Sequence, residues 1–578
     1  MYQILFINQK KTISVNSGTL AEACSEAGFP LNLVCGGKGT CGKCLTTIEI
    51  DGNNQNVSAC QYMVSENLVV YLNDTDLVDQ SFHLSNQLIK ENYVFNPALK
   101  KRHFQHSELK PENYSDFLAS SPLLLLQKFS DFIHADKRNG ITAIYHQNQI
   151  IDFQENNTTD WLYGGAIDIG TTSVVLYLYD LKTGELIQTE SSLNKQISFG
   201  ADVIARILSC QENDTALTEL NQCIIDTINI LLEKCYQNHP HLRENLYELI
   251  LCGNSTMQHL FFKLNPIALG VFPYANICED SILTNNRHFG LKIPDYALIE
   301  FLPLLGGFVG ADTTSVLLTL PQDEKKYLMI DLGTNGEIAV GNNTQFYTAS
   351  TACGPALEGA SLECGMRASE GAIEKITLDH DELSIKVIGN TTPIGLCGSG
   401  IVDAVAVLRS AGIIDHTGYL LTPDEYDMNH PESQLLSRLS ITDSDDVVFY
   451  FSTGENPVFI SQNDIRQIQL AKSSIYSGCI TLLTACDLSL EDVDELVLAG
   501  AFGNFINIKN ALAIGLLPPL PAEKITSIGN GAGLGVQLCL LNQNENQRTR
   551  QIKENTVQLN LADSPDFMET YIMNMNFN

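Results

Sequence analysis

The sequence is poor in positive charge and lacks any long apolar run. Lys and Arg number 34 against 67 Asp and Glu, so the formal net charge is -33 and the isoelectric point is about 4.6. This balance argues against nucleic acid or an anionic membrane as a partner, because both would be repelled. The longest strongly apolar run, residues 122–126, is far too short to cross a bilayer.

The start of the sequence does not predict a secretory leader. The apolar start, residues 1–7, is followed at once by polar residues 8–11, without a small-residue cleavage site. We therefore expect a cytoplasmic protein. The 578 residues, 44% of them hydrophobic, indicate several folded domains. Sixteen cysteines in such a chain indicate thiols and metal ligands more than disulfides.

Four of these cysteines form the sharpest local pattern in the chain: Cys35, Cys41, Cys44 and Cys60. Glycines between them let the loop wrap tightly and direct backbone N–H groups at sulfur. The spacing resembles that of 2Fe-2S ferredoxins, with five residues rather than four between the first two ligands. A structural zinc site is the alternative, although zinc sites usually show paired C-x2-C knuckles.

The residues around these cysteines predict a β-grasp ferredoxin-like domain over 1–75. Alternating segments at 3–7 and 11–15 predict a hairpin, and Thr19 caps a short helix. Residues 76–96 are polar and without periodicity, which predicts a linker. Residues 97–160 predict a small middle domain, in which apolar residues at helical spacing are interpreted as core: Phe117, Leu118, Leu124, Leu125, Phe129, Phe132 and Ile133.

The centre of the chain carries a pattern typical of a phosphate-binding turn. An apolar strand ends in Asp168, after which Gly170 lets the backbone approach an anion while Thr171 and Thr172 offer hydroxyl and N–H donors. The same pattern returns in a second hairpin, with Asp331, Gly333, Thr334 and Asn335. Two such hairpins in two halves of one domain can clamp one triphosphate.

Glycine-rich turns follow further along the chain, beside buried strands. They contain Gly500, Ala501 and Gly503 in one turn, and Gly529, Asn530 and Gly531 in another. Helices are expected at 309–318 and 399–408. This order of strands, helices and glycine turns predicts a two-lobed α/β domain over 161–545, with a C-terminal extension at 546–578.

Taken in order, these motifs resemble those of the actin, Hsp70 and sugar-kinase superfamily. With an N-terminal 2Fe-2S domain, the whole chain resembles the ATP-dependent reductive activators of corrinoid proteins, which serve corrinoid methyltransferase and O-demethylase systems. Further stretches carry the match: Gly253-Asn-Ser-Thr-Met, Gly307-Phe-Val-Gly-Ala-Asp, Cys353-Gly-Pro-Ala-Leu-Glu and Cys397-Gly-Ser-Gly.

The resemblance implies that a 2Fe-2S cluster passes one electron to Co(II) and restores Co(I), and that ATP hydrolysis drives the step. In this interpretation Asp168 and Asp331 hold Mg²⁺ through water. The threonines and Asn335 bind phosphates, and the glycine turns line the adenosine slot. Glu337 and Glu358 would lie near the terminal phosphate and could position water, but solvated loop carboxylates are an equal alternative.

The implied partners are a Co(II) corrinoid protein and a low-potential donor such as a ferredoxin or flavodoxin, in a possible homodimer. Two alternatives stay open. An activator of a 2-hydroxyacyl-CoA dehydratase shares the ATPase fold, but carries a 4Fe-4S cluster on cysteines of the ATPase domain. A small-molecule kinase with a redox-regulated ferredoxin domain would need a sugar pocket.

Overall fold

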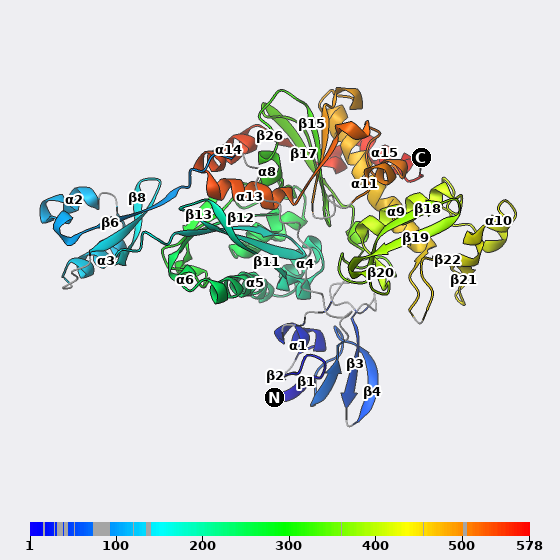
Figure 1. Ribbon diagram of the computed structural model, residues 1–578, viewed down its shortest axis with the longest axis horizontal. Helices are drawn as coiled ribbons and strands as arrows, with labels where there is room; N and C mark the ends of the chain where they lie inside the picture. Colours follow the sequence, from blue (N-terminus) through cyan, green and yellow to red (C-terminus); the bar gives the residue numbers. More distant parts are fainter. Residues whose placement is uncertain are drawn as a thin grey trace.

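Figure 1 shows an elongated molecule with two central lobes, a small domain at one end and the N-terminal domain below the lobes. This computed structural model describes residues 1–578 except 16–17, 28, 30, 32–38, 40–43, 51, 73–92, 119–120, 135–139, 360, 455, 501–505 and 578. Within the described part of the chain, every helix is too short or too polar to traverse a lipid bilayer.

The N-terminal domain is a five-stranded sheet with a helix packed against it, in the β-grasp arrangement. The strand order is β2-β1-β5-β3-β4, with β1 and β5 parallel. The strands are β1 (Tyr2–Phe6), β2 (Lys11–Val15), β3 (Leu45–Ile50), β4 (Asn53–Ser58) and β5 (Leu68–Tyr71). Helix α1 (Leu20–Glu26) begins where the Thr19 hydroxyl accepts the N–H of Glu22 at 3.2 Å.

The small domain is a three-stranded sheet covered by short helices. It contains β6 (Leu99–Phe104), α2 (Tyr114–Phe117), α3 (Leu123–His134), β7 (Ile141–His146) and β8 (Gln149–Glu155). Leu125 and Phe129 are buried as predicted, and the Phe129 ring packs on Phe153. Leu124 is 48% exposed, so its assignment to the core is wrong. It lies in the first turn of α3 and is exposed to solvent.

The end of the predicted linker is attached to the first lobe. The Tyr93 hydroxyl donates to the Gly184 carbonyl at 2.9 Å. Asn96 pairs with Asn542, and its N–H donates to the Leu541 carbonyl at 2.9 Å. Residues 93–96 therefore do not behave as a linker, while 76–92 lie outside the described residues.

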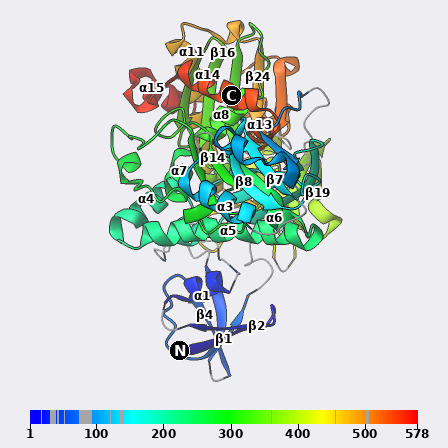
Figure 2. The same ribbon diagram turned by 90° about the vertical axis from the view of Figure 1, so that its left-hand side faces the viewer.

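The first lobe is built on a six-stranded sheet in the order β11-β10-β9-β12-β14-β13. Its strands are β9 (Tyr163–Ile169), β10 (Ser173–Asp180), β11 (Glu185–Leu193), β12 (Leu246–Gly253), β13 (Ile282–Asn285) and β14 (Leu298–Phe301). Figure 2 shows α5 running along the base of this lobe, above the N-terminal domain. The helices are α4 (Val203–Glu212), α5 (Ala216–Asn238), α6 (Leu242–Asn245) and α7 (Ser255–Phe261).

The second lobe repeats the same plan in the order β25-β24-β15-β16-β17-β26. Its strands are β15 (Tyr327–Leu332), β16 (Gly336–Asn342), β17 (Gln345–Thr351), β24 (Glu495–Ala499), β25 (Ile525–Gly529) and β26 (Thr556–Gln558). Each lobe thus has an antiparallel hairpin, with parallel strands added beside its first strand. Strand β26, from the predicted C-terminal extension, pairs with β17.

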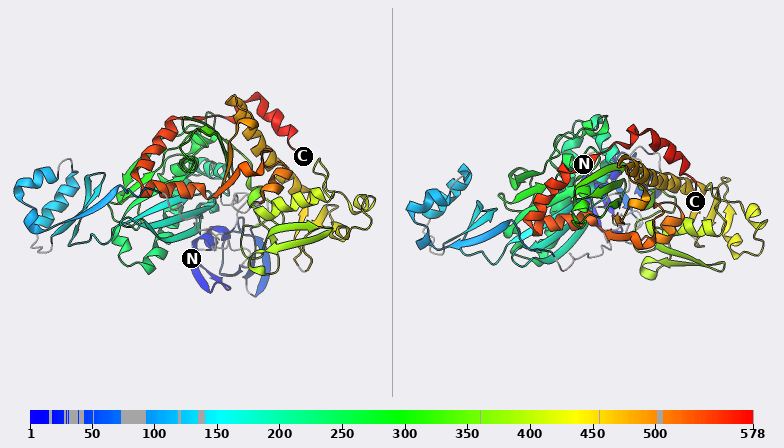
Figure 3. Two further views of the ribbon diagram at one scale, coloured as in Figure 1. Left: turned by 45° about the horizontal axis from the view of Figure 1, so that its top comes forward. Right: turned by 90° about the horizontal axis from the view of Figure 1, so that it is seen from above.

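Helices and two smaller sheets complete this lobe, which lies opposite the small domain in the view from above (Figure 3). The sheets are β18 (Ala372–Asp379), β19 (Glu382–Val387) and β20 (Gly395–Leu396), and β21 (Leu439–Ile441), β22 (Val447–Tyr450) and β23 (Phe459–Ser461). The helices are α9 (Gly398–Ser410), α10 (Pro423–Asp427), α11 (Gln462–Ala485), α12 (Ile508–Ala513), α14 (Gln543–Glu554) and α15 (Pro565–Met573).

Two helices hold the lobes together where the sheets meet: α8 (Ala311–Leu318) and α13 (Gly531–Leu541). They approach closely at Gly535, where an added Cβ would lie 2.0 Å from the Ser315 carbonyl oxygen. Only glycine fits there. This contact brings the carboxyl ends of β9 and β15, each carrying an aspartate, to one cleft.

Candidate active site: a nucleotide cleft between two lobes

A cavity of about 470 Å³ lies between the lobes and is lined by both hairpin turns. We call residues 168–173 the first phosphate turn and 331–336 the second. The cavity is lined by these residues that the sequence predicted for the site: Asp168, Gly170, Thr171, Thr172, Asp331, Gly333, Thr334, Asn335, Glu337, Gly500 and Asn530. Gly529 and Gly531 are not among the lining residues, and Ala501 and Gly503 lie outside the described residues.

Side chains from other elements hold the first phosphate turn. The Asn530 side chain accepts the N–H of Gly533 at 2.8 Å, which caps α13, and donates to Asp168 Oδ2 at 2.9 Å. Asn254 donates to the Thr171 hydroxyl at 2.9 Å. The buried Arg206 guanidinium donates to the Thr171 carbonyl. These hydrogen bonds therefore fix the shape of the turn.

Backbone geometry dominates the second phosphate turn. The Gly333 N–H donates to the Asn335 carbonyl at 3.0 Å, and the Thr334 hydroxyl donates to Glu358 Oε2 at 3.0 Å. Gly500 has φ +94°, and an added Cβ would lie 2.4 Å from the Leu332 carbonyl oxygen. Glycine at 500 therefore lets the chain pass close to the end of β15.

The floor of the cleft is a cluster of carboxyl groups. Burial, and then Asp312 and Asp168, raise the pKa of Asp331 to about 8. Burial raises the pKa of Asp312 to about 6, with a further contribution from Asp168. Burial, Asp312 and Asp331 hold the pKa of Glu337 well above its usual range. These groups repel one another, so the site favours a cation.

A hydrated Mg²⁺ fits this donor set. Among the described residues, no three His, Cys, Asp or Glu side chains are close enough to hold an ion by themselves. Mg²⁺ usually keeps several waters and is bound by one or two carboxylates together with substrate phosphates. Asp168 and Asp331 would therefore hold, through its waters, an ion that arrives with a polyphosphate.

The N-terminal domain places two of the predicted cluster cysteines together. Cys44 and Cys60 are buried, with their Sγ atoms 3.2 Å apart. Burial raises the pKa of the Cys60 thiol, and a backbone hydrogen bond from Gly39 lowers it. Two thiolates on one tetrahedral metal, at about 2.3 Å each, lie about 3.8 Å apart, so the two sulfurs would need to separate by only about 0.6 Å to share a metal or cluster. Cys35 and Cys41 lie outside the described residues.

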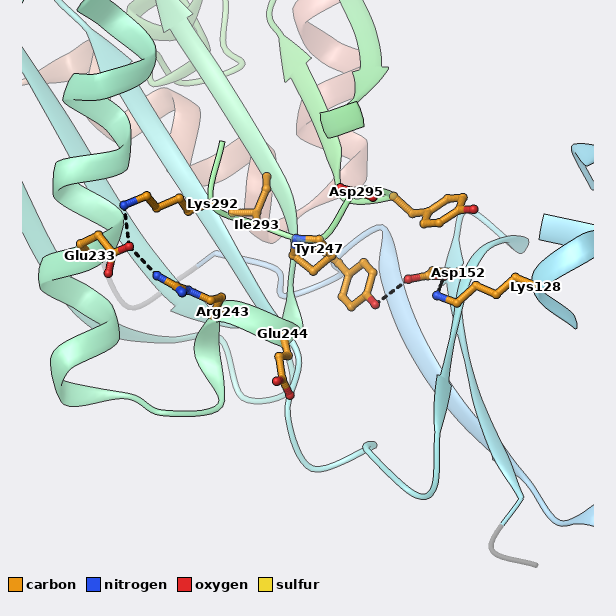
Figure 4. A pocket seen from close by; sticks show the side chains of 11 residues that line it. Lys128, Asp152, Glu233, Arg243, Glu244, Tyr247, Lys292, Ile293 and Asp295 are labelled. Atoms are coloured by element: carbon orange, nitrogen blue, oxygen red, sulfur yellow. Dashed lines mark hydrogen bonds and ion pairs between the residues drawn. The ribbon is translucent and has the colours of Figure 1, made fainter. Parts of the chain in front are cut away.

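A second cavity, of about 610 Å³, lies where the small domain meets the first lobe (Figure 4). All three of its basic side chains, Lys128, Arg243 and Lys292, are paired with acidic residues of the same cavity. Glu233 is paired with both Arg243 and Lys292, and Asp152 accepts the Tyr247 hydroxyl at 2.7 Å. Because these cations already have acidic partners, the cleft between the lobes is the better candidate for an anionic ligand.

Comparisons with known proteins agree with this geometry. Residues 325–578 match the model described as the C-terminal domain of RACo, the ASKHA domain, and 163–325 match the RACo middle region. The chain is 42% identical to the corrinoid activation enzyme RamQ of Eubacterium limosum, over 100% of this chain and 99% of that protein. The chain belongs to the family of reductive activators of corrinoid proteins.

Two more distant relatives carry related names. The Co(II) methylated amine-specific corrinoid protein reductase of Methanosarcina barkeri is 25% identical, over 64% of this chain and 68% of that protein. The solved structure of a reductive activator for corrinoid, iron-sulfur protein is 27% identical, with a TM-score of 0.74, over 100% of this chain and 98% of that one. Like other members of this family, the chain is an ATP-dependent reductase with an ASKHA ATPase domain.

Three residues of this reductive activator's cleft were assigned no role from the sequence. Asn254 and Asp312 stand in motifs that carried the family resemblance, and each lies one or two residues after a glycine near the start of a helix, which is a usable signal. Arg367 lines the cleft from a loop, and nothing in its local sequence marks it. These residues join the site through the packing of the two lobes.

Proposed function

We propose that this chain restores the Co(I) state of a corrinoid protein by passing it one electron from a 2Fe-2S cluster, driven by hydrolysis of Mg²⁺-bound ATP. The observation that carries this proposal is the carboxyl cluster shared by two lobes. Asp168 comes from one lobe, and Asp331 comes from the other. A nucleotide held by both turns favours a closed arrangement, so its binding and hydrolysis can change how the lobes present themselves to a partner.

The free energy needed to reduce Co(II) is comparable to the free energy that a nucleotide-driven conformational change can supply. Plant-type 2Fe-2S clusters have potentials near about −400 mV, and Co(I) is harder to make. A shortfall on the order of 0.1–0.2 V corresponds to roughly 2–5 kcal/mol for one electron. Moving a two-state equilibrium from 1:99 to 99:1 takes about 5.5 kcal/mol of differential binding. Nucleotide-driven closure can therefore supply the difference.

Different residues of the cleft would have different roles in ATP hydrolysis. Asp168 and Asp331 would orient the water shell of Mg²⁺, which neutralises charge on the phosphates. The Thr171 hydroxyl and the backbone of both turns would contact phosphate oxygens. Asp312, with its pKa near 6 because of burial and the neighbouring Asp168, is suited to accept a proton from an attacking water at neutral pH.

The N-terminal domain would hold the redox group. Cys44 and Cys60 would bind it together with Cys35 and Cys41, and the Gly39 N–H would stabilise thiolate charge on Cys60. When bound, a 2Fe-2S cluster supplies one electron at low potential. Helix α1 lies next to the 3-10 turn Lys195–Phe199, so this domain is near the nucleotide lobe. A ferredoxin or flavodoxin in the cytoplasm is the proposed electron donor, and a homodimer is the proposed assembly.

The decisive experiment mixes the reduced protein with a Co(II) corrinoid protein, with and without Mg·ATP, and follows cobalt by its visible spectrum. We expect Co(I) to form only with ATP. Cys60→Ala should abolish this reduction and leave ATP hydrolysis largely unchanged, because the nucleotide cleft is in another domain. Cys24→Ala is the matched control, since Cys24 is a buried thiol of the same domain outside the predicted ligand set. An intact cluster spectrum in Cys60→Ala would contradict the ligand assignment.

A further inference from the structure

Arg367 stands out among the residues that line the cleft between the lobes. Of the lining residues that the structure describes, it is the one basic side chain. The acidic side chains around the same cavity are Asp168, Asp312, Asp331, Glu337, Glu358 and Glu374. A cleft with this balance would repel a free polyphosphate, so the placement of its one guanidinium matters.

The guanidinium of Arg367 is short of acceptors. Its Nη1 atom is buried and has no hydrogen-bond partner among the described residues. Burial lowers the pKa of Arg367, and the carboxylate of Glu358 acts in the opposite direction. A buried charged donor without an acceptor is costly, and such groups in folded proteins usually have a partner. The site therefore suits an acceptor that the protein itself does not provide.

The backbone on both sides of Arg367 is fixed. The Met366 N–H donates to the Leu396 carbonyl at 2.9 Å, and the Ser369 N–H donates to the Arg367 carbonyl at 2.8 Å. These bonds anchor the segment beside β20 in the second lobe. The side chain therefore starts from a defined position at the wall of the cavity, which reduces the entropy lost when it binds a ligand.

Glu358 connects Arg367 to the second phosphate turn. Burial raises the pKa of Glu358, while Arg367 and the Thr334 hydroxyl, which donates at 3.0 Å, lower it. The turn, the carboxylate and the guanidinium thus form one electrostatic group. An anion that enters beside Thr334 would compete with Glu358 for the charge of Arg367.

A phosphate group meets these requirements. Guanidinium groups bind phosphate oxygens through two parallel N–H donors, and such charge-assisted bonds are among the strong ones. Mg²⁺ would neutralise the aspartates on one side of the polyphosphate, and Arg367 would neutralise the other. We propose that Arg367 binds a phosphate of the nucleotide at the second phosphate turn, where that phosphate would take the place of Glu358 as the nearest negative charge to the guanidinium. This inference rests on the ATP site proposed above.

The test measures binding of Mg·ATP and of adenosine to the full-length protein by isothermal titration calorimetry. Arg367→Gln should weaken Mg·ATP binding about 10- to 100-fold, the range expected for a hydrogen bond to a charged group. Adenosine binding should stay unchanged, which also shows that the cleft is folded. Arg367→Lys should recover part of the loss, because the charge is kept but the planar pair of donors is not.

Two further variants sharpen the assignment. Glu358→Gln removes the competing carboxylate, so it should strengthen Mg·ATP binding a few-fold in the wild-type background and have no such effect beside Arg367→Gln. Arg409→Gln is the matched control, because Arg409 Nε is also buried without a partner among the described residues but lies at the end of α9, outside the cavity. It should leave Mg·ATP binding unchanged.

Unchanged Mg·ATP affinity in Arg367→Gln would overturn the proposal. An equal loss of Mg·ATP and adenosine affinity would also overturn it, since that result indicates a structural role. A wild-type protein that fails to bind Mg·ATP would refute the nucleotide site itself, and the inference with it. The wild-type measurement thus separates a failure of the proposed function from a failure of this assignment.

Discussion

The two phosphate turns follow from one sequence pattern but are stabilised in different ways. In the first, Asn530 donates to Asp168 and Asn254 donates to Thr171. In the second, burial and neighbouring acids set the pKa of Asp331 at about 8, without a hydrogen bond among its causes within the described residues. The difference teaches that side-chain amides hold the aspartate of the first turn, whereas the second turn is held through its backbone and the Thr334–Glu358 hydrogen bond and leaves its aspartate without such a donor.

The largest expected effect comes from removing either aspartate. Asp168→Asn and Asp331→Asn should each lower the rate of ATP hydrolysis by about 10²-fold or more, because each removes charge that orients one shared Mg²⁺-triphosphate. The double variant should be little worse than either single one, since the two residues act as a unit. Steady-state phosphate release measures this. If the two single-variant losses in activation free energy added up in the double variant, the two aspartates would act independently, which would contradict a shared Mg²⁺-triphosphate.

Replacing the glycine of each turn with alanine should lower the free energy of unfolding by different amounts. A Cβ at Gly170 would lie 2.7 Å from the Ser173 carbonyl oxygen, whereas at Gly333 the nearest atom, the Asn335 carbonyl oxygen, is 3.6 Å away. Gly170→Ala should therefore destabilise the lobe by about 1–3 kcal/mol, and Gly333→Ala by less than about 0.5 kcal/mol. Urea unfolding followed by circular dichroism measures both. Equal losses would contradict the geometry.

Removing the donor to Asp168 should make the first turn resemble the second. Asn530→Ala removes a helix cap, at about 1 kcal/mol, and a hydrogen bond that lowers the pKa of Asp168. The pH at which Mg·ATP binding reaches half its maximum should therefore move upward. Asn507→Ala is the control, since Asn507 caps α12 through the Asn510 N–H. A pH profile unchanged by Asn530→Ala would show that the donor does not act on Asp168.

A further expected effect is a pH dependence of stability in the nucleotide-free protein. The folded-state pKa of Asp331 is raised from 3.8 to about 8, so the folded state binds more protons than the unfolded state between these values. The stability from this protonation is fully present below about pH 4 and is lost as pH rises toward 8. The thermal midpoint should fall from pH 6 to pH 8, and less so in Asp331→Asn. An identical fall in that variant would assign the effect to other groups.

The two turns could be predicted because their signal is local. An apolar strand, an aspartate, a glycine and hydroxyl residues within a few positions already specify a strand that ends in a tight, anion-facing turn. The cysteine spacing is local in the same sense. The apolar residues at helical spacing in the small domain were harder to interpret, because Leu124 and Leu125 are neighbours in sequence and one of them faces solvent. Helical periodicity alone does not decide which side of a short helix is covered.

The sequence by itself determined the elements of the site and their family, because strands, turns and helix caps depend on residues close in the chain. Only the tertiary structure decided which of these elements share one cleft. Asp312, Asn254 and Arg367 reach the cavity because α8 and α13 pack through Gly535 and bring two sheets together. The same packing brings Asp168, Asp312 and Asp331 near one another across the cleft. The raised pKa values of Asp312 and Asp331 follow from burial and from that proximity, which no single segment contains.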